Sequence, residues 1–196
     1  MLFCKKIQNH TNIFQLGFSL IELMVTIAII TLVTGVVLVR YNSFNNVIIL
    51  TDQAYELALD IREAQVLGVS VGGTSDSFRK AYGIYITLTT PNRYLLFQDN
   101  LTTGLKLQYD SGEEIGEPYT IDSRFEITQI CTTKSGVERC DNTDVSMVFK
   151  RPDFDAKITT NIVSYPDQLT IVVSSVRDSS VSKRIVLYPS GQISVQ

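Results

Sequence analysis

The chain has 196 residues, 44% of them hydrophobic, and a formal net charge of −3, which suits one modest globular domain. The acidic balance gives no general attraction to nucleic acid. The only histidine is His10, so the remaining 186 residues downstream contain no Ser/His/Asp site, no Cys/His site and no zinc site built on histidine.

A long apolar segment follows a short basic leader. Between Phe18 and Val39 only Glu22 is charged, and these 22 residues would form a helix of about 33 Å, enough to cross a bilayer. Lys5 and Lys6 precede the segment, and positive charge on that side favours a cytoplasmic leader with the bulk of the chain outside. We therefore expect a single-pass inner-membrane protein with an extracytoplasmic head. A secretory signal peptide and a plain uncleaved anchor are the alternatives, but neither accounts for Glu22.

The start of this segment, Gly17-Phe18-Ser19-Leu20-Ile21-Glu22, resembles the class III signal of type IV pilins and type II secretion pseudopilins. The resemblance implies that a prepilin peptidase removes residues 1–17, cuts between Gly17 and Phe18, and N-methylates Phe18. It also implies that Glu22 meets the terminal amine of a neighbouring subunit during assembly. The implied partners are other pilin or pseudopilin subunits, the prepilin peptidase and an inner-membrane assembly platform. Loss of Lys5 and Lys6 would change the net charge to −5.

One long helix is predicted for residues 18–71. Residues 18–39 would be the transmembrane and assembly helix, in which small and hydroxyl residues allow close helix contacts: Thr26, Thr31, Thr34 and Gly35. Residues 40–71 would be an amphipathic half packed on the head, or on a partner helix. Its apolar stripe repeats at steps of four and three residues and consists of Leu50, Ala54, Leu57, Ile61, Ala64 and Gly68.

Residues 72–196 are predicted to form a β-rich head. After a connection at Gly72-Gly73-Thr74-Ser75, the sequence alternates with a period of two. Strands are predicted from residue 81 to 89 and at Arg93–Gln98, Tyr119–Cys131, Val145–Phe149, Gln168–Ser174, Lys183–Tyr188 and Gln192–Val195. Many strands after one helix predict an α+β fold with antiparallel strands in two packed sheets.

The two cysteines beyond the leader, Cys131 and Cys140, bracket a predicted hairpin. A two-residue turn at Ser135-Gly136 would place 131 opposite 140 at a non-hydrogen-bonded position, where a cross-strand disulfide fits. Free thiols or a metal site are the alternatives.

The head also resembles the GspH/FimT-type minor pseudopilins. The resemblance rests on the Tyr82-Gly83-Ile84-Tyr85 strand, on Val148-Phe149-Lys150-Arg151-Pro152, and on the closing segment from Arg184 to Ile193. It implies a long helix followed by a β-rich head. Gln192 stands where that family often has a basic residue, so a nucleic-acid role is not carried over.

Two charged groups are weaker candidates. An acidic loop could hold Ca²⁺, although its spacing is not that of an EF-hand: Asp110, Glu113, Glu114 and Glu117. A basic hairpin edge could contact DNA phosphates, although solvated strand ends explain it equally: Arg177, Lys183 and Arg184.

The sequence therefore predicts a structural subunit rather than an enzyme, and no cofactor. The alternatives are a minor pilin whose head binds DNA for uptake, and a major pilin. Secretion, a surface pilus and DNA uptake all remain open as the role of the filament.

Overall fold

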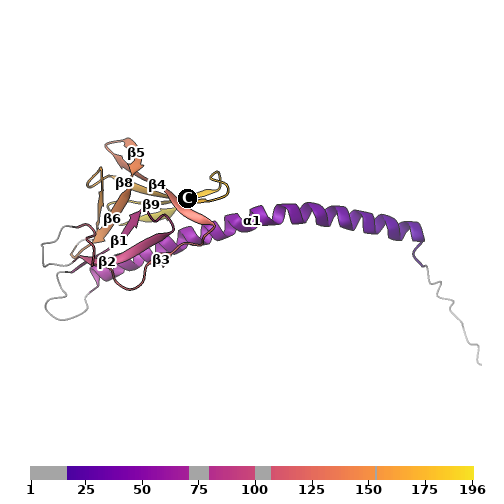
Figure 1. Ribbon diagram of the computed structural model, residues 1–196, viewed down its shortest axis with the longest axis horizontal. Coiled ribbons are helices and arrows are strands. Elements are labelled where there is room, and N and C mark those ends of the chain that lie inside the picture. The colour runs from indigo at the N-terminus through magenta and orange to yellow at the C-terminus, as the bar shows by residue number, and fades with distance from the viewer. Residues whose placement is uncertain (1–16, 71–79, 100–106, 153) are drawn as a thin grey trace, which may run out of the picture. The chain divides into compact units, whose positions relative to one another are not determined.

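The structure is a computed structural model that describes residues 17–70, 80–99, 107–152 and 154–196, with the backbone alone at 39–44 (Figure 1). The predicted leader up to residue 16 and the connection at Gly72–Ser75 lie outside the described residues. The chain divides into two units, Met1–Ser43 and Phe44–Gln196, and each is treated by itself.

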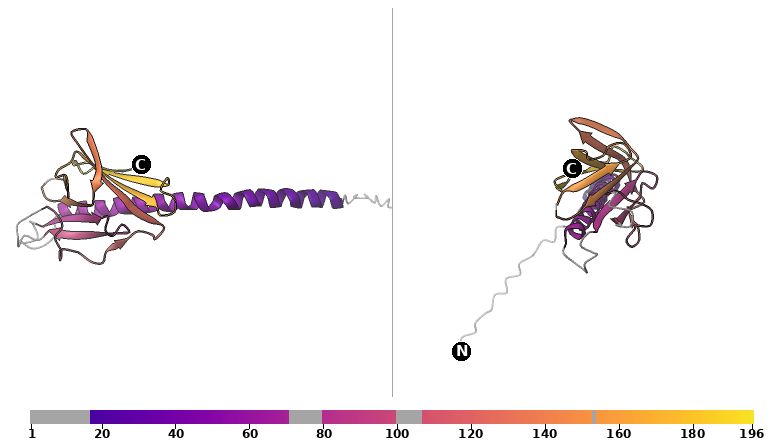
Figure 2. Two further views of the ribbon diagram at one scale, coloured as in Figure 1. Left: turned by 45° about the horizontal axis from the view of Figure 1, so that its top comes forward. Right: turned by 90° about the vertical axis from the view of Figure 1, so that its left-hand side faces the viewer.

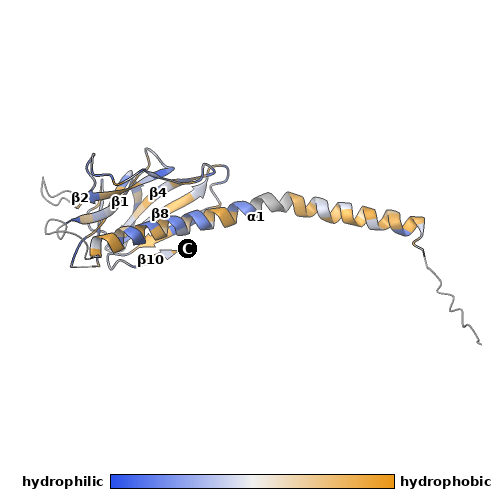
Figure 3. Ribbon diagram, turned by 90° about the horizontal axis from the view of Figure 1, so that it is seen from below, coloured by the Kyte–Doolittle hydropathy of each residue, from blue (hydrophilic) through white to orange (hydrophobic). Residues whose placement is uncertain are grey.

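The helix α1 (Leu20–Val69) contributes to both units. Its first part, Leu20–Leu38, has a mean hydropathy of 2.4 and is the segment within the described residues that is long and apolar enough to cross a membrane. Figure 3 shows this part orange along its length, whereas polar and apolar residues alternate in the part that belongs to the second unit. The side chains of Leu20–Leu38 are exposed.

The second unit contains two antiparallel sheets of five strands, so the α+β fold and the two sheets predicted from the sequence are confirmed. Sheet A has the strand order β3 (Tyr119–Thr120), β2 (Arg93–Asp99), β1 (Ala81–Thr87), β6 (Asp144–Phe149) and β7 (Ala156–Thr160). Sheet B has the order β10 (Ile193–Val195), β9 (Ser182–Leu187), β8 (Gln168–Ser175), β4 (Phe125–Lys134) and β5 (Val137–Asn142).

One core joins the two sheets and the second half of α1. The six residues of the predicted helix stripe are buried there, together with Ile84 and Met147 of sheet A and Ile171 and Ile185 of sheet B. Gly68 allows the helix to approach β6 closely, because a Cβ at this position would lie 2.5 Å from the carbonyl oxygen of Phe149. In Figure 2 the strands of the two sheets lie on different sides of this helical segment. The helix is thus the third layer of the head.

Two elements differ from the sequence prediction. The predicted strand Tyr119–Cys131 is two strands in different sheets, because a turn at Asp122 interrupts it: the N–H of Phe125 donates to the carbonyl oxygen of Asp122 at 2.8 Å. Strand β7 was not predicted. It has only two apolar residues, Ala156 and Ile158, which are too few for a clear alternation.

Candidate functional site

The predicted processing site lies just before the start of α1. Gly17, Phe18 and Ser19 are not helical and are exposed, and Phe18 keeps 82% of its surface accessible. The peptide bond between Gly17 and Phe18 therefore lies outside the helix and is exposed, with nothing within 4 Å of a Cβ built on Gly17.

Glu22 lies in the first turn of the helix, and Ser19 caps that turn. The N–H of Glu22 donates to Ser19 Oγ at 3.2 Å, and the N–H of Leu23 donates to the Ser19 carbonyl oxygen at 3.2 Å. A carboxylate at this position also faces the positive end of the helix dipole. This role of Ser19 was not predicted, although Ser-x-x-Glu is the spacing of a capping box.

The surface that follows Glu22 is almost purely apolar. The hydroxyl of Thr26 donates to the Leu23 carbonyl oxygen at 2.9 Å, and that of Thr31 donates to the Ile27 carbonyl oxygen at 2.8 Å. These polar groups are satisfied inside their own helix. Thr26 and Thr31 can therefore face lipid or other helices with their hydroxyl groups paired.

Cys131 and Cys140 form a disulfide with an S–S distance of 2.00 Å. The predicted turn is present, since Lys134 pairs with Val137 and the register continues to Thr132↔Arg139. Beyond that pair the register shifts and resumes at Ile130↔Asn142, so the disulfide lies at a β-bulge and not in an unbroken ladder.

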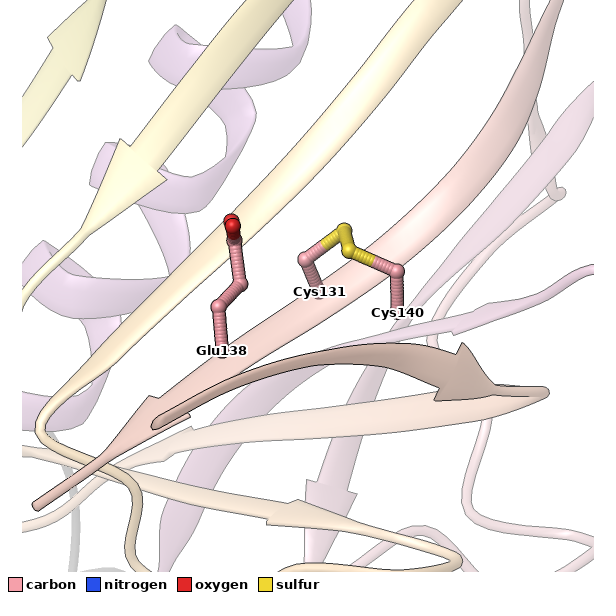
Figure 4. A group of neighbouring side chains, drawn as sticks. All are labelled: Cys131, Glu138 and Cys140. Atoms are coloured by element: carbon pink, nitrogen blue, oxygen red, sulfur yellow. A yellow bond between two sulfur atoms is a disulfide. The ribbon is translucent and has the colours of Figure 1, made fainter. Parts of the chain in front are cut away.

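The carboxylate of Glu138 lies beside this disulfide (Figure 4). Among the described residues, these three side chains are the only His, Cys, Asp or Glu group close enough to hold a metal ion, with ligand atoms within 4.8 Å of one another. Both sulfur atoms are consumed by the S–S bond and are not thiolates, so the group lacks the ligands that a soft metal needs.

The acidic loop does not gather its carboxylates at one point. Glu113 is buried, and its Oε2 accepts a hydrogen bond from the N–H of Asp110 at 3.1 Å. Glu114 accepts a hydrogen bond from the hydroxyl of Tyr109. Desolvation by burial, and then this hydrogen bond, raise the pKa of Tyr109 to about 12. These carboxylates shape the loop, and Glu117 is exposed at its end.

The basic hairpin edge is divided between two faces. Lys183 and Arg184 are neighbours on β9, and neighbouring side chains on a strand point to opposite faces. Arg177 lies in the turn after β8. The three cations therefore do not form one basic surface.

Comparison with known families gives one result that bears on these residues. The family model described as the prokaryotic N-terminal methylation motif matches residues 14–38. The match supports a pilin-type protein with a class III signal, a processed N-terminus and membrane anchoring. The comparisons with curated proteins and with solved structures found no match.

Proposed function

We propose that this protein is a minor pseudopilin or minor pilin of the GspH/FimT type, in a type IV pilus-like or type II secretion filament. A prepilin peptidase cuts between Gly17 and Phe18 and methylates Phe18. Residues 18–39 hold the subunit in the inner membrane and later form the assembly helix, while the head lies outside the cytoplasm. The assembly platform moves the subunit from the membrane into the filament.

One observation carries this proposal: the methylation motif covers residues 14–38 and so includes the helical segment Leu20–Leu38, which is exposed and carries no charge apart from Glu22. A surface of this kind is stable only in lipid or against other apolar helices. The exposed peptide bond before Phe18 supports cleavage, because the new terminus would not disturb the helix.

In this proposal Glu22 sets the axial position of the subunit relative to its neighbour. It lies in the first turn of α1, at the start of the apolar segment and so near a face of the bilayer. Its carboxylate is costly in the apolar surroundings of a filament core, and the methylated amine of a neighbouring subunit would offset that cost. The contact then sets how far one subunit is displaced along its neighbour.

The test combines intact mass with immunogold labelling of native filaments, using an antibody to the head. We expect a mass of Phe18–Gln196 plus one methyl group, with label at filament tips or missing from long filaments. Label along whole filaments would identify a major pilin instead. An uncut mass without filament label would overturn the proposal and leave a plain membrane-anchored β domain.

A further inference from the structure

A cleft of about 460 Å³, the hairpin cleft, lies between the β4–β5 hairpin and the turn that follows β7. Thr132 pairs with Arg139 and Lys134 pairs with Val137. Side chains that are paired in this way lie on the same side of a strand pair, so these four share one face of the hairpin. They form one wall of the cleft, and the turn supplies Ile162 to the opposite wall.

The hairpin cleft combines two cations with exposed apolar surface. Lys134 Nζ donates to the carbonyl oxygen of Ser164 at 2.8 Å, so its charge is held inside the cleft. Arg139 is exposed and forms no ion pair with another described residue. Val137 and Ile162 keep 61% and 41% of their surface accessible. The walls therefore suit a carboxylate that is accompanied by an apolar side chain.

Strand β5 is an edge of sheet B and offers its backbone to a partner. It pairs with β4, no other described strand adjoins it, and residues 137–141 are exposed. The two-residue turn closes with the hydrogen-bonded pair Lys134↔Val137, so the next pair, Thr133↔Glu138, is not hydrogen-bonded. The N–H and C=O of Glu138 therefore point away from β4, where an added strand could bond to them. Figure 1 shows β5 at the margin of the head.

The alternation of side chains along β5 decides which residues an added strand must carry. Val137 and Arg139 face the cleft, whereas Glu138 points to the other face of the hairpin, beside the disulfide (Figure 4). An antiparallel strand that bonds to Glu138 places one residue opposite each of these three. Opposite charges and apolar pairs stabilise such neighbours. The matching segment therefore reads, in its own chain direction, acid, base, apolar residue.

The same edge disfavours a second copy of this chain as the occupant. Two β5 strands paired about Glu138 would place this carboxylate opposite its own counterpart. Pairing about Arg139 would place two guanidinium groups opposite each other. Like charges that lie directly opposite destabilise a strand pair, so the edge selects a different chain.

We propose that β5 binds an extended acid–base–apolar segment of a different protein, which adds to sheet B as an antiparallel strand. The backbone of Glu138 holds the segment. Its acidic side chain lies beside Arg139 and Lys134, and its apolar side chain packs against Val137 and Ile162. This inference goes beyond the proposed function and does not depend on it, because it concerns the head alone.

The test uses the full-length protein in detergent and a synthetic peptide at about 1 mM, a concentration that detects weak binding. The peptide is acetyl-Thr-Thr-Glu-Lys-photoleucine-Thr-Thr-amide, and mass spectrometry locates the crosslink after irradiation. We expect the crosslink on the β4–β5 hairpin or on the turn after β7. A swapped peptide, in which Lys precedes Glu, has the same composition. It should crosslink about tenfold less, because both of its charges then face like charges.

Two further changes separate strand addition from simple attraction between charges. A methyl group on the backbone nitrogen of the peptide lysine keeps every charge but removes the hydrogen bond to the Glu138 carbonyl oxygen, so the crosslink should be lost. Arg139→Glu should reduce the crosslink about tenfold, because the attractive pair becomes repulsive. The matched control Arg184→Glu lies on β9, makes the same change of charge and should leave the crosslink unchanged.

The comparison of the two peptides on the unaltered protein decides the question even if Arg139→Glu fails to fold. Equal crosslinks from both peptides, an undiminished crosslink from the methylated peptide, or no crosslink on either segment overturns this inference. Intact mass of the same protein tests the proposed function separately, because cleavage before Phe18 does not involve β5.

Discussion

The hydroxyl group of Tyr94 on β2 donates a hydrogen bond to Asp60 Oδ2 on α1, with 2.5 Å between the two oxygen atoms. Partial burial raises the pKa of Asp60, and the bond from Tyr94 opposes this rise. Burial and the bond to Asp60 raise the pKa of Tyr94 well above its usual range. The pair therefore links sheet A to the helix through a hydrogen bond to a partly buried carboxylate.

Tyr94→Phe should lower the free energy of unfolding by about 1 to 2 kcal/mol, because it leaves a half-buried carboxylate without this donor. The measurement is urea unfolding of the detergent-solubilised protein, followed by near-UV circular dichroism of the tyrosines. A double-mutant cycle with Asp60→Asn isolates the bond, and a coupling energy near zero would contradict this account.

Acid should destabilise the head partly through Asp122. Hydrogen bonds from the side chain of Arg124, and then from its backbone N–H, lower the pKa of Asp122 to about 2. Because the pKa in the folded state is below the unfolded value, the stabilisation is complete above about pH 4 and is lost as the pH falls towards 2. Asp122→Asn should flatten stability against pH in this range.

Asp60 provides the control of opposite sign. Its raised pKa means that the folded head gains stability from this group as the pH falls, so Asp60→Asn should make the acid loss steeper. If both substitutions change the pH profile in the same direction, the assignment of these two carboxyls is wrong.

Gly68→Ala should destabilise the head by about 1 to 3 kcal/mol, although alanine is the better helix former. The new Cβ would lie 2.5 Å from the Phe149 carbonyl oxygen and 2.8 Å from its Cβ, so α1 would have to move away from β6. Gly35→Ala is the matched control, since no atom lies within 4 Å of a Cβ there. If the unfolding temperature rises equally for both variants, the close contact between Gly68 and Phe149 does not exist.

Much of this packing could be predicted from the sequence, and the reason is periodicity. The stripe from Leu50 to Gly68 keeps helical spacing over five turns, and each member is buried. The alternation through Ile171 and Val173 similarly identified β8. A short strand with little apolar content, such as Ala156–Thr160, has no comparable signal and obtains its place from the pairing of Met147 with Ile158.

The cleft beside the β4–β5 hairpin, which Lys134, Arg139 and Ile162 line, could not be predicted in this way. Lys134 and Arg139 stand close in the sequence, but Ile162 joins them only because the two sheets pack together. The converse holds for Lys183 and Arg184, which are adjacent in the chain and separated by the pleat of β9. The class III signal could be recognised in the sequence because it depends on consecutive residues alone.

Removal of the disulfide should affect the β4–β5 hairpin first. Cys131 and Cys140 are nine residues apart, and a loop of this size is expected to contribute about 2.5 kcal/mol. The residues of β5 between Val137 and Asp141 are exposed and lie at the edge of sheet B, so the variant with both cysteines replaced by serine should lose amide protection there. Hydrogen exchange that accelerates equally in β8 would contradict a local role.

Glu22→Ala should be inserted and cleaved normally but should fail to enter filaments. The reason is that the neighbouring subunit's amine would lose its carboxylate partner in an apolar environment. Ser19→Ala is the control, because it removes the helix cap and keeps the carboxylate. Equal losses for the two variants would mean that Glu22 acts through the start of its own helix and not between subunits. The readout is the fraction of cleaved subunit recovered in sheared filaments.

The amide of Gln65 ties the last hairpin to the helix. Its Nε2 donates to the carbonyl oxygens of Phe154 at 3.2 Å and Gly191 at 3.4 Å, across separations of 89 and 126 residues. The helix is synthesised before the strands, and Gly191 between β9 and β10 leaves the ribosome long after Gln65. Folding of the head is consequently delayed until β9 and β10 have been made, and a chain truncated before β9 would expose the helix stripe to chaperones and proteases.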